Sequence, residues 1–450
     1  MNRTLNEKIE KNLGGEIEIK GWIKARRDMG KIVFLDLRDR SGLIQVVVVP
    51  SELDNESKKV VKELRPEYAL QIKGQVNERG EKQKNPDIVN GNVEVLAKEI
   101  KVLSKAETLP YELGTDMHMD TYLDNLPLNL RSEKSRAIFK IQATLVQGFR
   151  NHLNNNDFVE FQCPKIVGGA TEGGANVFTL DYFGGKAYLA QSPQFYKQKM
   201  VGVYERVYTL GKVYRAESHD TNRHLSEYTS LDFEMGFIND YSEVMDMMYD
   251  NLKKMFATVN EDCAKEMKIL NAEKPNLPKK YPVMTLKQVQ EILEEEYNEE
   301  GASKEPDLEP HQEELIGRYV KEKFNSDILF VTHYPKEKRP VYTMPDPENP
   351  DLTLSFDVLF RGTEIVTGGQ RIHDYEMLKK NMKEFGLNPQ DFEYYLMAFK
   401  YGMPPEGGIG MGLERLTWRL LGLDNIKQAT LFPRDRVRID LPLTKIDRKD

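Results

Sequence analysis

Residues 213–235 read VYRAESHDTNRHLSEYTSLDFEM, and this stretch decides the fold of most of the chain. Arg215 and Glu217 lie on the same face of a presumed strand, and Arg223, His224 and Glu227 follow after a polar loop. On both sides of the stretch, strands and Gly-rich turns alternate without regular βα repeats. That order predicts an α+β domain built on an antiparallel sheet with flanking helices.

The surrounding residues indicate where the helices of this domain lie. Residues 132–153 predict a long helix, because apolar residues recur there at every three or four positions. A helical, charged and Pro-punctuated stretch follows at residues 240–350, in which Thr285 and Gln288 are expected to form a capping box. Two further strands and a Gly-rich helix start are expected at residues 352–360, 364–368 and 407–416.

The N-terminal part of the chain has a different pattern. Residues 16–103 predict five strands with one helix after the third, which is the layout of an OB-fold, a small barrel that commonly binds oligonucleotides. Ser51 is expected to cap that helix and Pro66 to end it. The sequence therefore divides into an OB-fold at residues 1–104, a hinge at 105–130, and a second domain at 131–450 that carries a helical, charged insertion at about 240–350.

Composition bounds the class of protein. The 450 residues are 39% hydrophobic and 30% charged, with no apolar run near the roughly 20 residues that span a bilayer and no apolar stretch of a secretory signal at the start. We therefore expect a cytoplasmic protein with reduced thiols at Cys163 and Cys263. A net charge of −8 argues against nucleic acid as a partner, but basic residues cluster locally at Lys24, Arg26 and Arg27. The acidic run at residues 291–315 is expected to be a solvated surface.

Three further stretches carry charge of the kind that active sites bury. They are ATEGGANVF with LAQSPQFYKQ, FDVLFRGTEIVTGGQRIH, and GGIGMGLERLTWRL. Taken singly, each has a structural explanation: glycines as turn or packing residues, an Arg and a Glu as a surface ion pair, acids at strand ends. Together they supply arginines for a polyphosphate, acids for Mg²⁺, and a separate Lys and Arg for a carboxylate, which indicates nucleotidyl transfer onto a carboxylate.

These stretches resemble the three signature motifs of class II aminoacyl-tRNA synthetases. The sequence Arg215-Ala216-Glu217 matches motif 2, Gly412-Leu413-Glu414-Arg415 matches motif 3, and the helix that ends at FVEFQCPK is similar to motif 1. The OB-fold resembles the subgroup b of aspartyl, asparaginyl and lysyl enzymes. QSPQFYKQ, ATEGGANVF and RGTEIVTGGQR are similar to the aspartyl enzymes, and the short span between motifs 2 and 3 resembles their compact archaeal and eukaryotic type.

The resemblance implies that the second domain is the catalytic one and binds ATP and Mg²⁺. Arg215 would neutralise the α-phosphate, Arg415 would hold the γ-phosphate, and Tyr228 would stack on adenine. The residues implied to be catalytic are Arg215, Glu364 and Arg415. Those implied to bind ATP are Arg215, Glu217, Arg223, His224, Leu225, Tyr228, Glu364, Gly412 and Arg415. Those implied to hold the metal are Asp357, Glu364 and Thr367.

For the amino acid, the resemblance implies that Lys197 and Arg371 hold the side-chain carboxylate of aspartate. Two cations around one small acid would be left unpaired by neutral asparagine, at a high cost. The full set implied to bind aspartate is Glu172, Gln194, Lys197, Arg215, Thr367 and Arg371. Thr367 stands where the family has a serine, and it keeps the hydroxyl.

The OB-fold would then bind the tRNA anticodon, with Arg27, Phe34 and Gln45 at the positions that make contact in relatives. Lys24 stands where enzymes that discriminate between tRNAs carry a bulky aromatic residue. We therefore expect a relaxed enzyme that aspartylates both tRNA(Asp) and tRNA(Asn), and that depends on a partner amidotransferase to convert the second product. Motif 1 implies a homodimer.

Three alternatives stay open at this point. An asparaginyl-tRNA synthetase would share the fold and the ATP site, although Lys197 argues against it. An ammonia-using asparagine synthetase built on the same core would lack the OB-fold. A non-catalytic RNA-binding protein derived from a synthetase would be expected to have lost Arg215, Glu364 or Arg415, and all three are present.

Overall fold

The structure is a computed structural model that describes residues 2–85, 90–169, 176–217 and 221–445. These residues form two compact units, Met1–Thr115 and Asp116–Asp450. Each unit has its own hydrophobic core, and each is described by itself here. Among the helices of the described ranges, none is long and apolar enough to cross a membrane.

The first unit is a closed barrel whose strands follow the order β1-β2-β3-β5-β4. Side chains alternate between buried and partly exposed along β2 and β4, so each strand turns one face toward the core and one outward. Ile19, Leu35 and Ile72 are fully buried in that core. The strands are β1 (Glu16–Met29), β2 (Ile32–Arg38), β3 (Leu43–Val48), β4 (Ala69–Glu78) and β5 (Val93–Ser104). The OB-fold prediction is confirmed.

The helix between the third and fourth strands begins later than the sequence suggested. Helix α1 (Asn55–Val60) is capped by Asp54, whose side chain accepts a hydrogen bond from the backbone N–H of Ser57. Ser51, the expected cap, instead lies in a short 3-10 turn, Pro50–Glu52. The prediction of Ser51 as cap was therefore wrong, because the helix begins only after Asp54, and aspartate caps a helix as well as serine does.

The second unit is built on an eight-stranded sheet with the order β12-β13-β14-β15-β16-β11-β10-β6. Neighbours are antiparallel except at the two edges, where β12 runs parallel to β13 and β6 runs parallel to β10. The expected antiparallel sheet is thereby confirmed. The strands are β6 (Val159–Glu160), β10 (Arg206–Tyr214), β11 (Glu227–Gly236), β12 (Val283–Thr285), β13 (Ile328–Thr332), β14 (Ser355–Phe360), β15 (Glu364–Arg371) and β16 (Glu406–Gly412).

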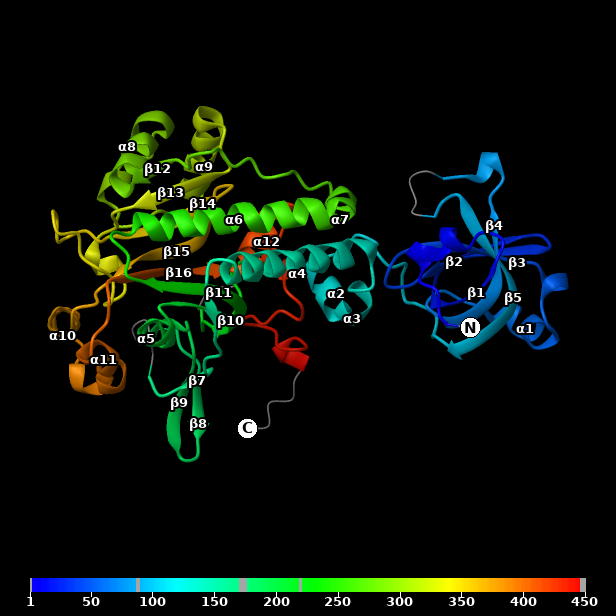
Figure 1. Ribbon diagram of the computed structural model, residues 1–450, viewed down its shortest axis with the longest axis horizontal. Helices are drawn as coiled ribbons and strands as arrows, with labels where there is room; N and C mark the ends of the chain where they lie inside the picture. The colour runs from blue at the N-terminus through cyan, green and yellow to red at the C-terminus, as the bar shows by residue number, and fades with distance from the viewer. Residues whose placement is uncertain (1, 86–89, 170–175, 218–220, 446–450) are drawn as a thin grey trace. The chain divides into compact units, whose positions relative to one another are not determined.

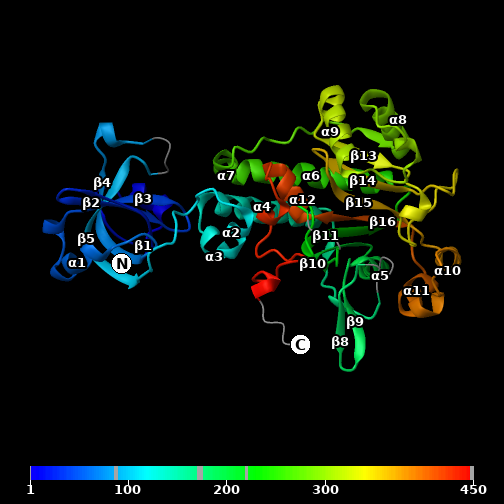
Figure 2. The same cartoon turned by 180° about the vertical axis from the view of Figure 1, so that it is seen from behind.

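Two long helices, α4 (Glu133–Asn154) and α6 (Ser242–Asp262), cover one face of this sheet. They lie on the near side in Figure 1 and on the far side in Figure 2. The long helix predicted at residues 132–153 is confirmed as α4, and Ser132 is its N-cap. The two helices approach closely, since a Cβ at Gly148 would lie 2.8 Å from the Cα of Met255. The main core of the unit lies between these helices and the sheet.

The glycine-rich stretch at residues 407–412 is a strand and not the start of a helix. β16 lies between β15 and β11, and helix α12 (Leu413–Leu421) begins only after it. A Cβ at Gly408 would lie 2.2 Å from the carbonyl oxygen of Phe233, and one at Gly407 would lie 2.8 Å from that of Gly369. The glycines are needed because the neighbouring strands leave no room for side chains. The spacing of residues along the sequence does not show this close approach.

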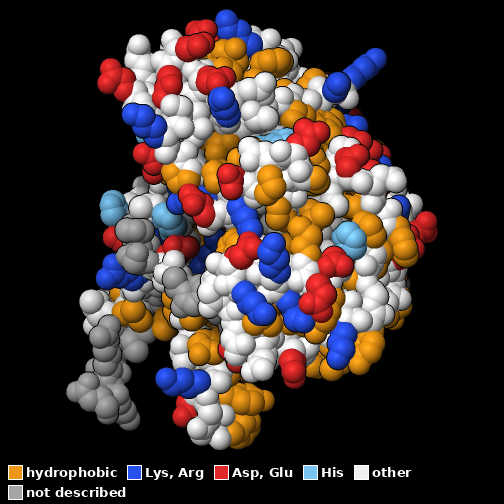
Figure 3. Space-filling view, turned by 90° about the vertical axis from the view of Figure 1, so that its left-hand side faces the viewer, with side chains coloured by type: hydrophobic (Ala, Val, Ile, Leu, Met, Phe, Trp, Pro, Cys, Tyr) orange, Lys and Arg blue, Asp and Glu red, His pale blue; other side chains and the backbone are white. Residues whose placement is uncertain are grey.

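The segment at residues 240–350 adds strands as well as helices. Helix α8 starts with the predicted capping box of Thr285 and Gln288, which is confirmed. Strands β12 and β13 extend the sheet, although the sequence suggested only helices there. Most acidic side chains of residues 291–315 are exposed, as expected of a solvated surface, and acidic side chains are seen over the upper part of Figure 3; Glu313 departs from the prediction, because it is only 7% exposed. The helices here are α6, α7 (Ala264–Ile269), α8 (Leu286–Tyr297) and α9 (Pro310–Phe324).

The remaining elements are short. A small three-stranded sheet protrudes at the lower edge of Figure 1. It consists of β7 (Ile166–Val167), β8 (Thr179–Tyr182) and β9 (Gly185–Leu189). The other helices are α2 (Met119–Asp124), α3 (Leu126–Asn129), α5 (Gln194–Tyr204), α10 (Tyr375–Glu384) and α11 (Glu393–Lys400).

Candidate active site

A cavity of about 350 Å³ opens on strands β11, β14, β15 and β16. It brings together stretches of sequence that lie more than two hundred residues apart. Of the side chains proposed from the sequence, the following line it: Gln194, Lys197, Arg215, Glu217, Arg223, His224, Leu225, Tyr228, Glu364, Thr367, Arg371, Gly412 and Arg415.

Lys197 lies at one end of the cavity, on α5, and is 1% exposed. Its Nζ is 3.0 Å from Asp232 Oδ2 and 3.1 Å from Glu234 Oε2, and it donates a 2.8 Å hydrogen bond to the carbonyl of Ile409. A lysine is rarely buried so deeply unless its charge is paired. Two acids of one strand therefore hold the ammonium group in place.

Arg371 lies at the same end, on β15, and is 5% exposed. Its Nε donates a 2.7 Å hydrogen bond to Glu234 Oε1, and its Nη2 donates one of 2.9 Å to the carbonyl of Gly408. Burial lowers the pKa of the guanidinium and Glu234 raises it, with the net direction upward. Lys197 and Arg371 thus share Glu234, and the structure places both predicted cations in one buried charge network.

Sequence reasoning missed the two acids of this network. Asp232 and Glu234 are two residues apart on β11, so both side chains point to the same face of the sheet. They are 1% and 0% exposed. The signal was present in the stretch SLDFEM, where two acids alternate with Leu231 and Phe233, since charged residues that alternate with core residues on a central strand need cations opposite them.

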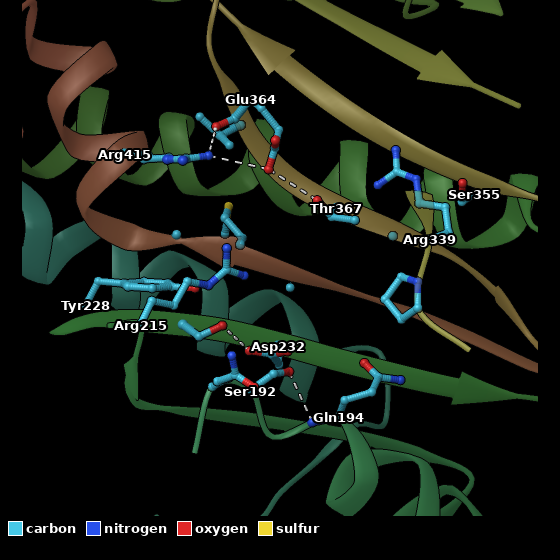
Figure 4. Close-up of a pocket in the computed structure, with 18 of the residues that line it drawn as sticks. Ser192, Gln194, Arg215, Tyr228, Asp232, Arg339, Ser355, Glu364, Thr367 and Arg415 are labelled. Atoms are coloured by element: carbon cyan, nitrogen blue, oxygen red, sulfur yellow. Dashed lines mark hydrogen bonds and ion pairs between the residues drawn. The ribbon is translucent and has the colours of Figure 1, made fainter. Parts of the chain in front are cut away.

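Arg415, Glu364 and Thr367 meet at the other end of the cavity (Figure 4). Arg415 Nη1 lies 3.1 Å from the carbonyl oxygen and 3.4 Å from Oε1 of Glu364, and the hydroxyl of Thr367 donates to the same Oε1 at 3.2 Å. The side chains of Arg415 and Glu364 are 32% and 36% exposed. This end is therefore wetter than the lysine end.

Arg215 and Tyr228 lie side by side between the two ends. The centre of the guanidinium is 5.9 Å from the centre of the tyrosine ring. Tyr228 packs at the rim of a small apolar cluster that includes Leu225 and Trp418. The planar ring thus borders the cavity on an apolar support, as a base-stacking residue requires.

Asp357, predicted as a metal ligand, does not line the cavity. It pairs with Thr367 across strands β14 and β15, and Arg339 binds both of its carboxylate oxygens, at 3.1 and 2.6 Å. Burial raises the pKa of Asp357 to about 6, and the guanidinium of Arg339 opposes that shift. Arg339 itself stacks 3.7 Å above the ring of Tyr334. No local pattern in the sequence indicates that Asp357 has a cationic partner.

Arg223 reaches outward from the cavity to a residue that sequence reasoning did not consider. Its Nη2 donates a 2.7 Å hydrogen bond to Oε2 of Glu313, on helix α9. Burial and the neighbouring Glu364 raise the pKa of Glu313 to about 7, against the effect of Arg223. Next to Arg223, His224 Nδ1 lies 2.7 Å from the hydroxyl of Thr221.

Glu172, proposed for the amino group of aspartate, lies outside the described residues.

The three residues proposed for the anticodon lie together on the outer face of the barrel. Arg27 pairs with Phe34 across β1 and β2, and Gln45 pairs with Asp36 across β2 and β3. Arg27 binds both carboxylate oxygens of Asp36, at 2.6 and 2.9 Å, and lies 3.4 Å from Gln45 Oε1. Phe34 alternates with buried neighbours on the same strand, so its ring faces away from the core.

Two family models match the chain. The model described as tRNA synthetases class II (D, K and N) matches residues 118–436, and the model described as OB-fold nucleic acid binding domain matches residues 17–103. The second of these matches lies within the barrel, and the first covers every residue of the cavity.

Individual relatives agree with these models. The chain is 46% identical to an aspartate–tRNA(Asp/Asn) ligase of Thermus thermophilus over 97% of this chain and 99% of that protein. It is 40% identical to an aspartate–tRNA(Asp) ligase of Thermococcus kodakarensis, over 96% and 98%. Among solved structures, an asparaginyl-tRNA synthetase of Pyrococcus horikoshii with asparaginyl-adenylate has a TM-score of 0.89 at 30% identity, covering 98% of this chain and all of that one. An aspartyl-tRNA synthetase of Entamoeba histolytica has a TM-score of 0.84 at 31%, over 98% and 93%.

Proposed function

This chain belongs to the class II aminoacyl-tRNA synthetases, in the group of the aspartate–tRNA ligases, and from that premise we propose that it activates L-aspartate with ATP and transfers it to tRNA. The observation that carries the choice of aspartate is the buried pair of cations, Lys197 and Arg371, at one end of the cavity. Arginines that suit a triphosphate lie toward the other end.

The amino-acid end favours an acidic side chain over an amide. Lys197 and Arg371 are held by Asp232 and Glu234, so their positions are set before a ligand arrives. A carboxylate would accept hydrogen bonds from both cations, whereas the NH₂ of asparagine would bring donors against donors. Gln194 would orient the substrate, and Glu172 is assigned to the α-ammonium group.

The phosphate end supports in-line transfer at the α-phosphorus. The α-carboxylate of aspartate attacks and pyrophosphate leaves, which gives aspartyl-adenylate. The terminal adenosine hydroxyl of tRNA then attacks the activated carbonyl, and AMP leaves as the ester forms. No protein nucleophile is needed, so the chain contributes position and charge. Arg215 would neutralise charge that builds on the α-phosphate, Arg415 would hold the γ-phosphate, and Tyr228 would stack on adenine.

The residues present fit Mg²⁺ when it enters with ATP. Glu364 and Thr367 bring a carboxylate and a hydroxyl within 3.2 Å of each other at the cavity wall, and Mg²⁺ in such sites is bound by one or two carboxylates plus substrate phosphates. The ion would supply charge neutralisation on the phosphates. Asp357 would join the ligands only by exchanging Arg339, which occupies both of its oxygens.

For tRNA, we assign the anticodon to Arg27, Phe34 and Gln45 on the barrel. We keep the functional division into an OB-fold at residues 1–104, a hinge at 105–130 and a catalytic domain at 131–450, with an insertion at about 240–350. The barrel should contribute affinity for tRNA and its recognition, and all bond making should take place in the catalytic domain.

We further propose that the enzyme aspartylates both tRNA(Asp) and tRNA(Asn), which would require a partner amidotransferase. Lys24 is exposed on β1, where a cation can approach phosphate or either base without rejecting one. Four relatives, at 40–46% identity, are named for both tRNAs and support this proposal, and four, at 38–40% identity, are named for tRNA(Asp) alone and oppose it. Aspartylation of the two purified tRNAs, measured side by side, tests it. A preference above about a hundredfold, roughly 2.7 kcal/mol, contradicts it.

A homodimer in the cytoplasm completes the proposal. The helix α4 and the strand β6 that follows it are the segment that resembles motif 1. Val159, in β6, and Ile166, shortly after it, are exposed apolar residues. Light scattering at micromolar concentration tests the dimer, and a monodisperse monomer contradicts it.

Asparagine activation is the second candidate, because the asparaginyl-tRNA synthetase structure matches with a TM-score of 0.89. ATP–pyrophosphate exchange with aspartate, asparagine and lysine in parallel decides between them. We expect exchange with aspartate alone. Exchange that depends on asparagine, with no exchange for aspartate, would contradict the assignment of Lys197 and Arg371 to the side-chain carboxylate of aspartate.

A further inference from the structure

A buried carboxylate outside the predicted site touches two parts of its ATP end. Glu313, in the first turn of α9, is 7% exposed. Its Oε2 accepts a 2.7 Å hydrogen bond from Nη2 of Arg223 and a 3.1 Å hydrogen bond from the backbone N–H of Glu364. One oxygen atom therefore joins the loop between β10 and β11 to the first residue of β15.

The position of Glu313 is fixed by unusually close backbone packing. A Cβ at Gly317 would lie 2.6 Å from the Cα of Gly362, and a Cβ at Gly362 would lie 2.9 Å from the Cα of Glu314. Helix α9 thus rests directly on the turn between β14 and β15, which ends at Glu364. Because backbone contacts leave little room for adjustment, the distance between Glu313 and Glu364 is set by the fold.

Arg223 lies between β10 and β11 and contacts helix α9 through its side chain. The side chain of Arg223 is 15% exposed, and its guanidinium reaches Glu313. A charge-assisted hydrogen bond of this length is among the stronger polar contacts in proteins. The ion pair therefore fastens a loop that lines the cavity to a helix that does not line it.

We propose that Glu313 is a positioning residue for ATP, through which helix α9 sets both the loop of Arg223 and the backbone at Glu364. This inference rests on the proposed function, since it assigns the phosphates of ATP to that end of the cavity. It also gives the segment at residues 240–350 a part in catalysis. Glu313 touches no substrate; it acts through Arg223 and Glu364.

The test compares Glu313→Ala with Glu314→Ala in the full-length protein. Glu314 is the next residue of the same helix and carries the same charge, but its side chain is exposed. In ATP–pyrophosphate exchange, Glu313→Ala should raise the KM for ATP by at least about tenfold, with the KM for aspartate within about twofold. Glu314→Ala should match the wild type. Glu313→Gln keeps an acceptor oxygen without the charge and should fall between the two.

A second measurement does not depend on activity. Trypsin cuts after arginine only when the side chain can enter its specificity pocket, and the contact with Glu313 withholds Arg223. Limited trypsinolysis followed by mass spectrometry should show faster cleavage after Arg223 in Glu313→Ala than in the wild type or Glu314→Ala. ATP should slow that cleavage in the wild type.

The inference is overturned if the KM for ATP in Glu313→Ala stays within twofold of the wild type, if both KM values rise together, or if cleavage after Arg223 is unchanged. If circular dichroism shows Glu313→Ala to be unfolded, Glu313→Gln decides by the same criteria, with an expected rise of about threefold. If the wild-type protein exchanges pyrophosphate in the absence of aspartate, the proposed function is contradicted instead. The cleavage experiment alone then decides the role of Glu313.

Discussion

The two ends of the cavity handle charge in opposite ways. At the amino-acid end, Lys197 and Arg371 are almost fully buried, and each is bound to an acid of β11. At the phosphate end, the side chains of Arg415 and Glu364 are about a third exposed, and their closest contact is 3.1 Å. The amino-acid end is therefore closed and its charges are balanced, whereas at the phosphate end the pair of Arg415 and Glu364 is exposed and loosely made.

The difference follows from what each end must recognise. A buried cation is tolerated only when its charge is already compensated, so the amino-acid end is assembled during folding and stays rigid. A rigid arrangement of donors can distinguish a carboxylate from an amide. Water screens the charges at the phosphate end, so that end can exchange partners when a triphosphate arrives. Selectivity and adaptability are thus located at different depths of one cavity.

The largest expected effect is at the closed end. Arg371→Leu leaves Lys197 to balance both Asp232 and Glu234, and removing one partner of a buried ion pair costs about 3–5 kcal/mol. We expect aspartate-dependent pyrophosphate exchange to fall by roughly a thousandfold. ATP affinity, measured by calorimetry, should change by less than about threefold, since the lost cation faces the amino acid. An equal loss of ATP affinity would show that the two ends are not independent.

A smaller effect is expected at the open end. Arg415→Ala removes one charge that stabilises the transferring phosphates, and such a loss lowers kcat by about a hundredfold. Because the side chain is a third exposed, the melting temperature should stay within about 2 °C of the wild type. Exchange kinetics and differential scanning fluorimetry on the same preparation measure both. A large fall in melting temperature would mean that this end, too, is part of the folded core.

The barrel extends the comparison to the tRNA. Phe34→Ala removes an outward ring whose stacking on a base is worth roughly 1–3 kcal/mol. We expect the KM for tRNA in aspartylation to rise about tenfold, while pyrophosphate exchange without tRNA is unchanged. Loss of both activities in a folded variant would contradict the separation of recognition from bond making.

The smallest effect is expected at Glu406, which is fully buried next to the closed end. Burial, with a further contribution from Glu234, raises the pKa of Glu406 well above 4.5, so the folded protein holds its proton more tightly than the unfolded chain does. The free energy of unfolding should therefore decrease as the pH rises above 4.5 toward the folded pKa.

Glu406→Gln mimics the protonated acid and keeps an oxygen for Gln198, whose amide donates to Glu406 at 2.8 Å. We expect the KM for aspartate to change by less than about twofold. Chemical denaturation across this pH range should show a flatter dependence in the variant. Glu234→Gln is the matched comparison, because Glu234 pairs with Lys197 and Arg371, and it should lose most aspartate-dependent activity.

Local patterns in the sequence were enough for the barrel, the long helix α4 and the capping box at Thr285. Each of these depends on residues close together in the chain, where periodicity and capping rules apply. The cavity lining also followed from motifs, although their charged residues lie on different elements, with Lys197 on α5, Arg371 on β15 and Arg415 on α12. The sequence could therefore name most side chains that meet there.

Contacts between distant segments were not predictable in the same way. The pairs Arg339–Asp357 and Arg223–Glu313 join residues 18 and 90 positions apart, and nothing local marks either partner. The error at residues 407–412 has the same origin. Whether a run of glycines forms a strand or the start of a helix depends on how closely Phe233 and Gly369 approach from neighbouring strands.

The central position of strand β16 has a consequence for how rarely its backbone hydrogen bonds open to solvent. It is a central strand, bonded on one side to β11 and on the other to β15, and its glycines allow the two neighbours to close in on it. It cannot separate unless both neighbours are released, so its amide protons should exchange with solvent only in the rarest, most global openings of this unit. Strands β11, β15 and β16 line the cavity. The backbone amides of these strands should therefore keep their hydrogen long after the outer turns of α10 and α11 have exchanged theirs for deuterium.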